Sequence, residues 1–279
     1  MSPDSARAAL DAAAAAGDRP LAIAETALAL ALLDRVDGGA AAPALDPSLA
    51  ALDAIVAAVA EAEARGASPE AALSAAIAGR LGYRGDADTY DDLANADLIR
   101  VIERRRGLPV ALGILYIHAA RARGLAAAGL NVPGHFLIGV EAAGRRHALD
   151  PFNGGAPVGR DAVRALLRRA DPGEGDAELA VAMSTVPDRA VLLRLQNNIK
   201  LRRLQAGDTA GGLAVLARMR RMAPASAELV GEEAGLLAAA GAMRAATAAL
   251  RGWLDAGHGD GAVRRQLEAQ LAGIGSRLN

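Results

Sequence analysis

Residues 103–125 have the sequence ERRRGLPVALGILYIHAARARGL, and this stretch decides the fold. Pro109 favours the first turn of a helix, where its missing amide hydrogen is not needed. The residues that follow are mainly apolar. Gly124 then provides an end, because glycine readily adopts the left-handed conformation that closes many helices. We therefore predict a helix over residues 109–123.

Three further helices are predicted before this stretch. They cover residues 21–36, 47–65 and 69–82, and glycine lies at or just after the end of each. A polar loop is expected over residues 83–95 and a short helix over residues 97–106. Alanine supplies much of the 52% apolar content and favours helix, so the composition also indicates a mainly helical protein.

The sequence pattern changes after residue 124. Three short segments, residues 125–131, 135–140 and 146–149, are divided by glycine and proline and predict strands. Residues 142–144 predict the hairpin turn between the last two. Because no other region predicts strands, we expect a small antiparallel sheet.

The C-terminal part of the chain is expected to be helical. Residues 171–176 (DPGEGD) predict a linker, which divides the chain into domains over residues 1–175 and 176–279. Beyond residue 187, three pairs of identical residues recur at a spacing of 34, the tetratricopeptide period: Gly207 with Gly241, Ala214 with Ala248, and Leu216 with Leu250. Two repeats are too few to stand alone, so this tail is expected to pack on the preceding domain.

Composition excludes several classes of function. The chain has no cysteine, which rules out disulfides, thiolate metal sites and thiol nucleophiles. A net charge of −1 argues against a general attraction to nucleic acid or anionic membranes. No signal peptide and no spanning helix are predicted, so we expect a cytoplasmic protein without membrane contact. No metal and no cofactor are expected.

Of the four histidines, His135 has the most suggestive context. It follows a Val-Pro-Gly turn at the start of a predicted strand, and Asp150 ends the strand expected to pair with it. A hairpin would bring the two side chains together, where aspartate could orient the imidazole as a base. An alternative stays open, in which Asp150 caps a tight turn and His135 donates to a backbone carbonyl.

Three blocks of this sequence together resemble the SirB family of transglutaminase-like proteins, which carry a tetratricopeptide tail. They are residues 103–125, VPGHFL at 132–137 and LDPFNGG at 149–155. The resemblance covers nearly the whole chain. It implies an α+β, mostly helical fold, with a papain/transglutaminase-like core, a small antiparallel sheet and a helical tetratricopeptide-like tail.

The resemblance also implies a Cys-His-Asp triad, with His135 as the base and Asp150 as the orienting acid. Counting back from Gly124 places Pro109 where the cysteine would stand. Proline has no nucleophile and no backbone N–H for an oxyanion, and no serine or threonine lies in this helix. Covalent acyl transfer therefore lacks its first step.

The sequence thus predicts a non-catalytic binding or regulatory protein whose partner is a protein or peptide. Binding is expected in the old active-site cleft, around Gly107, Pro109, Gly134, His135, Asp150 and Asn153. The alternative is a hydrolase of non-standard mechanism that uses His135 and Asp150 to activate water.

A cluster of arginines at residue 100 and residues 104–106 suggests a third function, phosphate or nucleic-acid binding. However, no aromatic platform for bases lies nearby, and the total charge is balanced. These arginines could instead end a solvated helix, or one could pair with Asp86 or Asp91. Nucleic acid is therefore not the expected partner.

Overall fold

The central element of the structure is helix α6 (Pro109–Ala122), which begins where the sequence predicts and ends one residue earlier. This computed structural model describes residues 1–170 and 176–276. Residues 110–117 are buried without a break, as expected of a helix that is apolar on every side. The helices that pack around α6 include α2 (Ile23–Asp37), α3 (Asp46–Ala64), α4 (Pro69–Ser74) and α9 (Asp188–Gln205).

The predicted helices of the front half are confirmed, with most ends shifted by one or two residues. The third of them is α4 continued by a π-helical turn over Ala75–Arg80. The short helix before α6 is α5 (Leu98–Arg104), which stops early because Arg105 adopts a left-handed conformation with a φ of 55°. Helix α1 (Pro3–Ala16) was not predicted, and neither was the helix over Arg160–Ala170. Ser2 caps α1, which buries an alanine and leucine stripe against α2.

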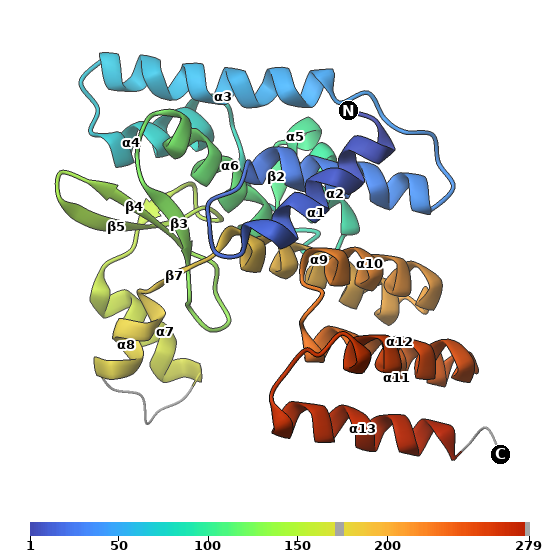
Figure 1. The fold of residues 1–279 in the computed structure, drawn as a ribbon. Helices are drawn as coiled ribbons and strands as arrows, with labels where there is room; N and C mark the ends of the chain where they lie inside the picture. The colour runs from blue at the N-terminus through green and yellow to red at the C-terminus, as the bar shows by residue number, and fades with distance from the viewer. Residues whose placement is uncertain (171–175, 277–279) are drawn as a thin grey trace.

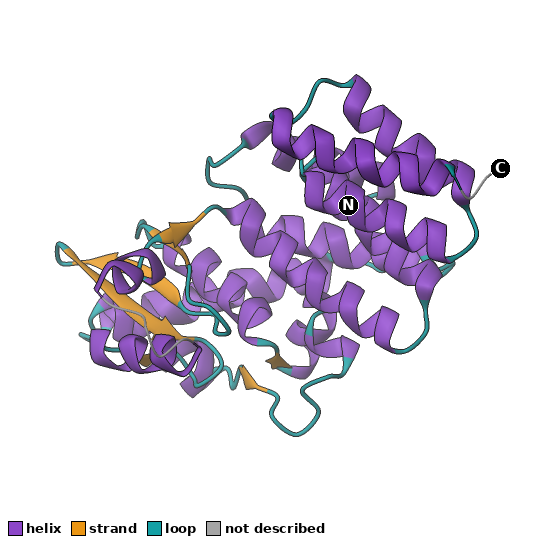
Figure 2. Cartoon of the chain, turned by 90° about the horizontal axis from the view of Figure 1, so that it is seen from below, coloured by secondary structure: helices purple, strands orange, loops and turns teal. Residues whose placement is uncertain are grey.

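The sheet has five strands in the order β6-β5-β4-β3-β7, and all neighbouring strands are antiparallel. The strands are β3 (Ala127–Leu130), β4 (Ile138–Ala142), β5 (Arg145–Asp150), β6 (Ala156–Pro157) and β7 (Thr185–Val186). The turn between β4 and β5 has positive φ angles at Ala143 and Gly144, which is typical of a type I′ hairpin. The small antiparallel sheet and the mainly helical fold class are confirmed, and Figure 2 shows most of the strands gathered at one end of the molecule.

Two features near the sheet differ from the predictions. The prediction that His135 starts a strand is wrong, because β4 begins at Ile138. The preceding segment instead directs the buried ring of Phe136 toward α6, where Gly113 has no side chain to exclude it. In addition, β1 (Arg84–Gly85) and β2 (Arg106–Gly107) form a two-residue parallel pair, which is too short to leave a periodic pattern in the sequence.

Both faces of the sheet are covered. α6 contacts β3 and β4 on one face. Side chains of the other face form a small core with α7 (Arg160–Ala170) and α8 (Asp176–Ala182), built from Leu130, Val132, Leu137, Ala148, Val163, Leu167, Leu179 and Ala182. The predicted linker, apart from Asp176, lies outside the described residues.

The tail consists of helix pairs stacked below the front half (Figure 1). They are α9 with α10 (Thr209–Met222) and α11 (Ala227–Ala239) with α12 (Met243–Asp255), followed by α13 (Gly261–Gly275). α9 and α10 share the main core with the front helices, and Arg218 of α10 is bound to Asp34 and Asp37 of α2. The tail therefore packs on the preceding helices.

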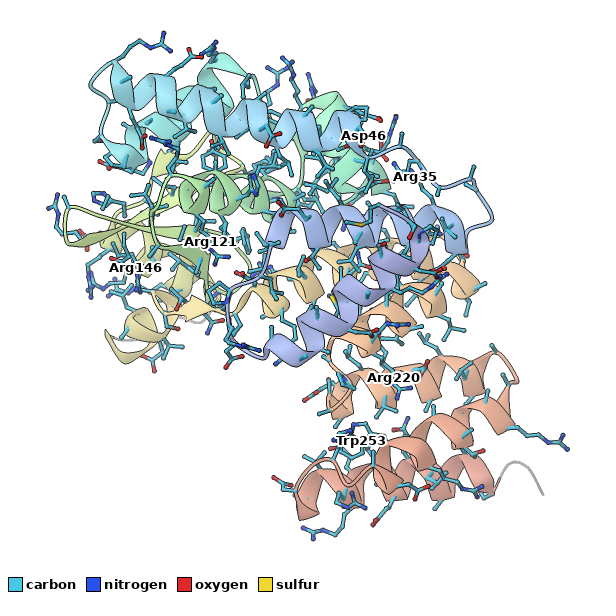
Figure 3. All side chains as sticks on the ribbon, turned by 45° about the horizontal axis from the view of Figure 1, so that its top comes forward. Arg35, Asp46, Arg121, Arg146, Arg220 and Trp253 are labelled. Atoms are coloured by element: carbon cyan, nitrogen blue, oxygen red, sulfur yellow. The ribbon has the colours of Figure 1, made fainter. Side chains whose placement is uncertain are left out.

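The last three helices have a core of their own. It surrounds Trp253, which is buried among α11, α12 and α13 (Figure 3). Arg220 of α10 pairs with Glu233 of α11, and Lys200 of α9 pairs with Glu232, so charged contacts join the two helix pairs. Within the described ranges, no helix is both long enough and apolar enough to cross a lipid bilayer.

Candidate functional site

The entry to α6 is held by a buried polar network. The parallel pair of β1 and β2 places Gly107 opposite Gly85. The Asn95 carbonyl accepts a hydrogen bond of 2.8 Å from the Leu108 amide, and the Asn95 side chain donates to the Thr89 carbonyl. Gly107 has to be glycine, because a Cβ there would lie 2.8 Å from the Val101 side chain. Pro109 follows at the first helical turn, half-buried.

The arginines before α6 are mostly engaged with carboxylates. Arg104 lies 3.0 Å from Asp86, which is only 2% exposed, so the predicted pairing with Asp86 is confirmed. Hydrogen bonds from Thr89, together with the Arg104 charge, hold the pKa of Asp86 below its usual value. Arg100 pairs with Glu103, and Arg106 pairs with an aspartate of the same loop, Asp88. Arg104 and Arg106 therefore stabilise the loop, while Arg100 is paired within its own helix.

His135 lies in the exposed loop before β4. Its carbonyl accepts a hydrogen bond of 2.7 Å from Arg194 of α9. The neighbouring Phe136 anchors the loop, since a Cβ on Gly113 of α6 would lie 2.3 Å from its ring. Within the described ranges, the His135 imidazole makes no hydrogen bond or ion pair, so it is free to meet a ligand.

Both carboxylate oxygens of Asp150 accept hydrogen bonds within its own turn. One carboxylate oxygen accepts hydrogen bonds from the amides of Phe152 and Asn153, at 3.0 and 3.2 Å, and the other accepts 2.7 Å from the Asn153 side chain. The structure thus gives the turn-capping arrangement for Asp150. No hydrogen bond in the described part of the chain joins Asp150 to His135.

Tyr116 of α6 lies beneath the same turn. Gly155 has a φ of 74°, and a Cβ on it would lie 2.7 Å from the Tyr116 ring. Burial, with a smaller effect from the nearby Asp150 charge, raises the pKa of the Tyr116 hydroxyl, which has no hydrogen-bond partner among the described residues. A neutral hydroxyl therefore lies under the Asp150 turn.

The six residues of the expected cleft fall into two neighbouring groups. The Asp150–Asn153 turn lies beside the Gly107 segment, because the amide of Gly85, in the strand that pairs with β2, donates 3.1 Å to the Phe152 carbonyl. The loop of Gly134 and His135 is held from the other side, by α9.

The side chains that connect these groups were not predicted from the sequence. The Tyr90 ring packs edge-on against Phe152, with centroids 5.9 Å apart, and the Arg202 guanidinium lies 5.7 Å from the Tyr90 ring centre. Arg202 also donates to the carbonyls of Tyr90 and Asp91. Arg194 similarly lies 5.4 Å from the ring centre of Phe136. The sequence did contain one signal for this cluster. Aromatic residues are rare in the chain, and both of its phenylalanines lie in this region.

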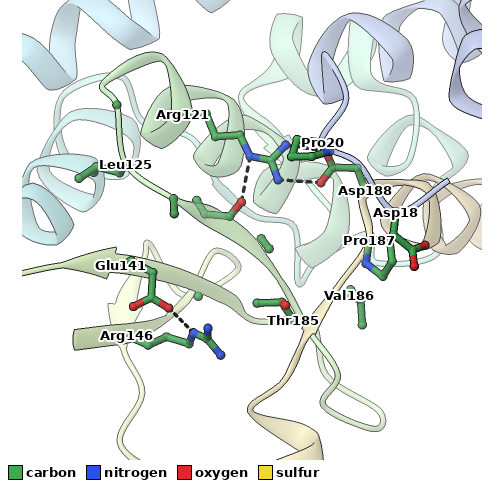
Figure 4. A pocket seen from close by; sticks show the side chains of 15 residues that line it. Asp18, Pro20, Arg121, Leu125, Glu141, Arg146, Thr185, Val186, Pro187 and Asp188 are labelled. Carbon is green, nitrogen blue, oxygen red and sulfur yellow. Dashed lines mark hydrogen bonds and ion pairs between the residues drawn. The ribbon is translucent and has the colours of Figure 1, made fainter. Parts of the chain in front are cut away.

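A separate cavity of about 820 Å³ lies between the sheet and α6 (Figure 4), and none of the six predicted residues lines it. Four of its charged side chains pair with one another. Arg121 lies 2.8 Å from buried Asp188 and donates 2.9 Å to the Ala127 carbonyl, while Arg146 pairs with Glu141. We interpret these contacts as structural links, since Arg121 joins the end of α6 to the start of α9.

Among residues 1–170 and 176–276, no group of three or more histidine, aspartate or glutamate side chains is arranged to hold a metal ion.

Comparison with known proteins gives a family. Residues 47–197, more than half the chain, match the family model of the transglutaminase-like superfamily. A UPF0162 protein of Xylella fastidiosa is 36% identical over 131 residues, which cover 46% of this chain and 47% of that protein. A UPF0162 protein of Pseudomonas aeruginosa is 30% identical over 155 residues, or 56% of each chain. The chain thus spans about half the length of the curated relatives it matches, and no solved structure matches it.

Proposed function

The chain belongs to the transglutaminase-like superfamily, and from this premise we propose that it binds a protein or peptide partner without catalysing acyl transfer. One observation carries the proposal: aromatic side chains on the loops around the start of α6 lie against two arginines of α9. The chain has only two phenylalanines, three tyrosines and one tryptophan. Tyr90, Phe136 and Phe152 all belong to these loops, beside Arg194 and Arg202.

Phe136 is buried and supports its loop, so the surface that a partner could contact is formed by Tyr90, Phe152 and the two arginines. Aromatic residues and arginine are enriched where protein partners contribute most of their binding free energy. Tyr90 is 44% exposed, although it is a large apolar side chain. Its position is fixed by Phe152 and Arg202, so little conformational entropy is lost when a partner covers it.

The absence of acyl transfer follows from the residues available. The chain has no cysteine. The resemblance to the SirB family places Pro109 at the nucleophile position, and this residue is the first of α6. A water-activating hydrolase would need Asp150 to orient His135. Asp150 instead accepts three hydrogen bonds from its own turn, an arrangement that favours the binding function over the hydrolase.

We also propose that the tail is tetratricopeptide-like, as in the SirB family, with the chain divided into residues 1–175 and 176–279. The 34-residue spacing supports this. Gly207 and Gly241 each follow the first helix of a pair and have φ angles of 78° and 79°. Leu216 and Leu250 are both fully buried in the second helix of their pair.

A peptide selection tests the binding function. The full chain is used to select peptides from a random displayed library, and selected peptides are measured by fluorescence anisotropy. We expect Tyr90→Ala to weaken binding about tenfold, the loss of one aromatic anchor. Val181→Ala, which removes an even more exposed apolar side chain, that of Val181 in α8, is the control and should bind unchanged.

Two results would contradict the proposal. One is equal binding of the selected peptides by the wild type and Tyr90→Ala. The other is turnover of amide, ester or isopeptide substrates by the purified chain that disappears in a folded His135→Ala variant.

A further inference from the structure

Arg194 differs from the other arginines that link the tail to the front half. Arg202, Arg203 and Arg218 each contact a carboxylate. Arg194 is half-buried, yet in the described ranges the one hydrogen bond of its side chain is the donation from Nη2 to the His135 carbonyl. A guanidinium has five N–H donors, so most of its capacity is unused.

Partial burial of this charge has a cost. Removal from water lowers the pKa of Arg194, because the surrounding protein stabilises the charged form less than water does. The Phe136 ring offsets part of this cost through a cation–π contact at 5.4 Å. A half-buried arginine with no carboxylate is therefore poised to receive one.

The nearby acids do not fill this role. Asp91 pairs with Arg202, and Asp150 is bonded within its own turn. Arg194 instead contacts the backbone carbonyl of His135, an exposed residue whose imidazole has no bonded partner in the described part of the chain. The Tyr90 ring lies against Arg202, which follows Arg194 on α9 by eight residues. The site thus offers a cation with unused N–H donors, held against the His135 loop and the Phe136 ring.

We propose that Arg194, beside His135 and Tyr90, binds a carboxylate of the partner, which makes the partner an acidic peptide. This inference rests on the proposed binding function and specifies its chemistry. The planar guanidinium can hold a carboxylate through two parallel hydrogen bonds. Tyr90 and Phe152 would then contact an apolar side chain next to the acidic one.

The test uses two labelled probes, acetyl-Leu-Glu-Glu-Leu-amide and its glutamine twin, acetyl-Leu-Gln-Gln-Leu-amide. Affinities are measured by anisotropy with the full chain at one fixed ionic strength. We expect the glutamate peptide to bind about tenfold more tightly, as a charge-assisted pair requires. In Arg194→Gln this preference should disappear, so that the two peptides bind with about equal affinity. Arg251→Gln, an exposed arginine of α12, is the control and should keep the preference.

A second variant separates carboxylate binding by Arg194 from its structural contact with the His135 loop. Arg194→Lys keeps the charge but loses the two-pronged geometry, so it should retain only part of the preference; melting curves check that each variant folds. Equal affinity for both probes, no binding of either, or an undiminished preference in Arg194→Gln overturns the carboxylate inference. If both probes bind equally and Tyr90→Ala weakens both, the proposed binding function survives without it.

Discussion

Gly113 of α6 provides a direct test of how the His135 loop is held. Alanine at this position would place a methyl group 2.3 Å from the Phe136 ring and 3.4 Å from Ile138. In an unobstructed helix, alanine is more stable than glycine by about 1 kcal/mol. Overpacking of a core costs about 1–3 kcal/mol. We therefore expect Gly113→Ala to lower the free energy of unfolding by about 1 kcal/mol.

The assay is urea unfolding of the full chain, followed by circular dichroism. Gly235→Ala in α11 is the matched control, because nothing lies within 4 Å of its Cβ position, and it should gain about 1 kcal/mol. Combining Gly113→Ala with Phe136→Leu should recover about 1 kcal/mol relative to the sum of the single variants, since the shorter side chain relieves the clash. If Gly113→Ala stabilises the chain as Gly235→Ala does, the Phe136 ring is not seated on α6.

Three further perturbations test neighbouring contacts. Asp150→Ala should lower the unfolding free energy by about 1–2 kcal/mol, because the turn amides lose their acceptor; an unchanged melting temperature would contradict the capping role. The pKa of Asp86 is lowered in the folded state, so its contribution to the free energy of unfolding is present above pH of about 4 and disappears as the pH falls further. Asp86→Asn should therefore lessen the loss of stability in acid, which melting curves from pH 3 to 7 measure. Arg202→Ala should speed amide hydrogen exchange in residues 83–95 about tenfold, and unchanged exchange would show that Arg202 does not hold this loop.

Residues at the helix ends were sufficient to predict those helices that begin or end at a proline or a glycine. Pro109 and Gly124 delimit α6 because one favours a first turn and the other a left-handed end, and both effects involve only adjacent residues. α1 was not predicted, because its alanine-rich sequence was considered only as a possible signal peptide and not as a helix of the fold. The start of β4 was misplaced because a Val-Pro-Gly turn does not reveal that Phe136 is drawn toward a glycine on another helix.

The candidate site was only partly accessible from sequence. Capping of the turn by Asp150 is a local effect and was weighed correctly as one of two alternatives. The contacts of Arg194 with His135 and of Arg202 with Tyr90 join residues 59 and 112 positions apart. No periodic pattern encodes such contacts, since they depend on how the tail packs against the front half.

Helix α9 sets the distance between the two loops of the candidate site. Arg194, Asn198 and Arg202 follow one another at four-residue intervals, so they lie along one side of the helix. Asn198 donates to the Arg194 carbonyl and accepts from Arg202, which stiffens this row. One end of the row holds the His135 loop and the other holds the Tyr90 loop, and eight residues of helix separate the two ends by about 12 Å. Because the spacing between the two loops is set by a helix of the tail, the proposed binding surface depends on both halves of the chain together.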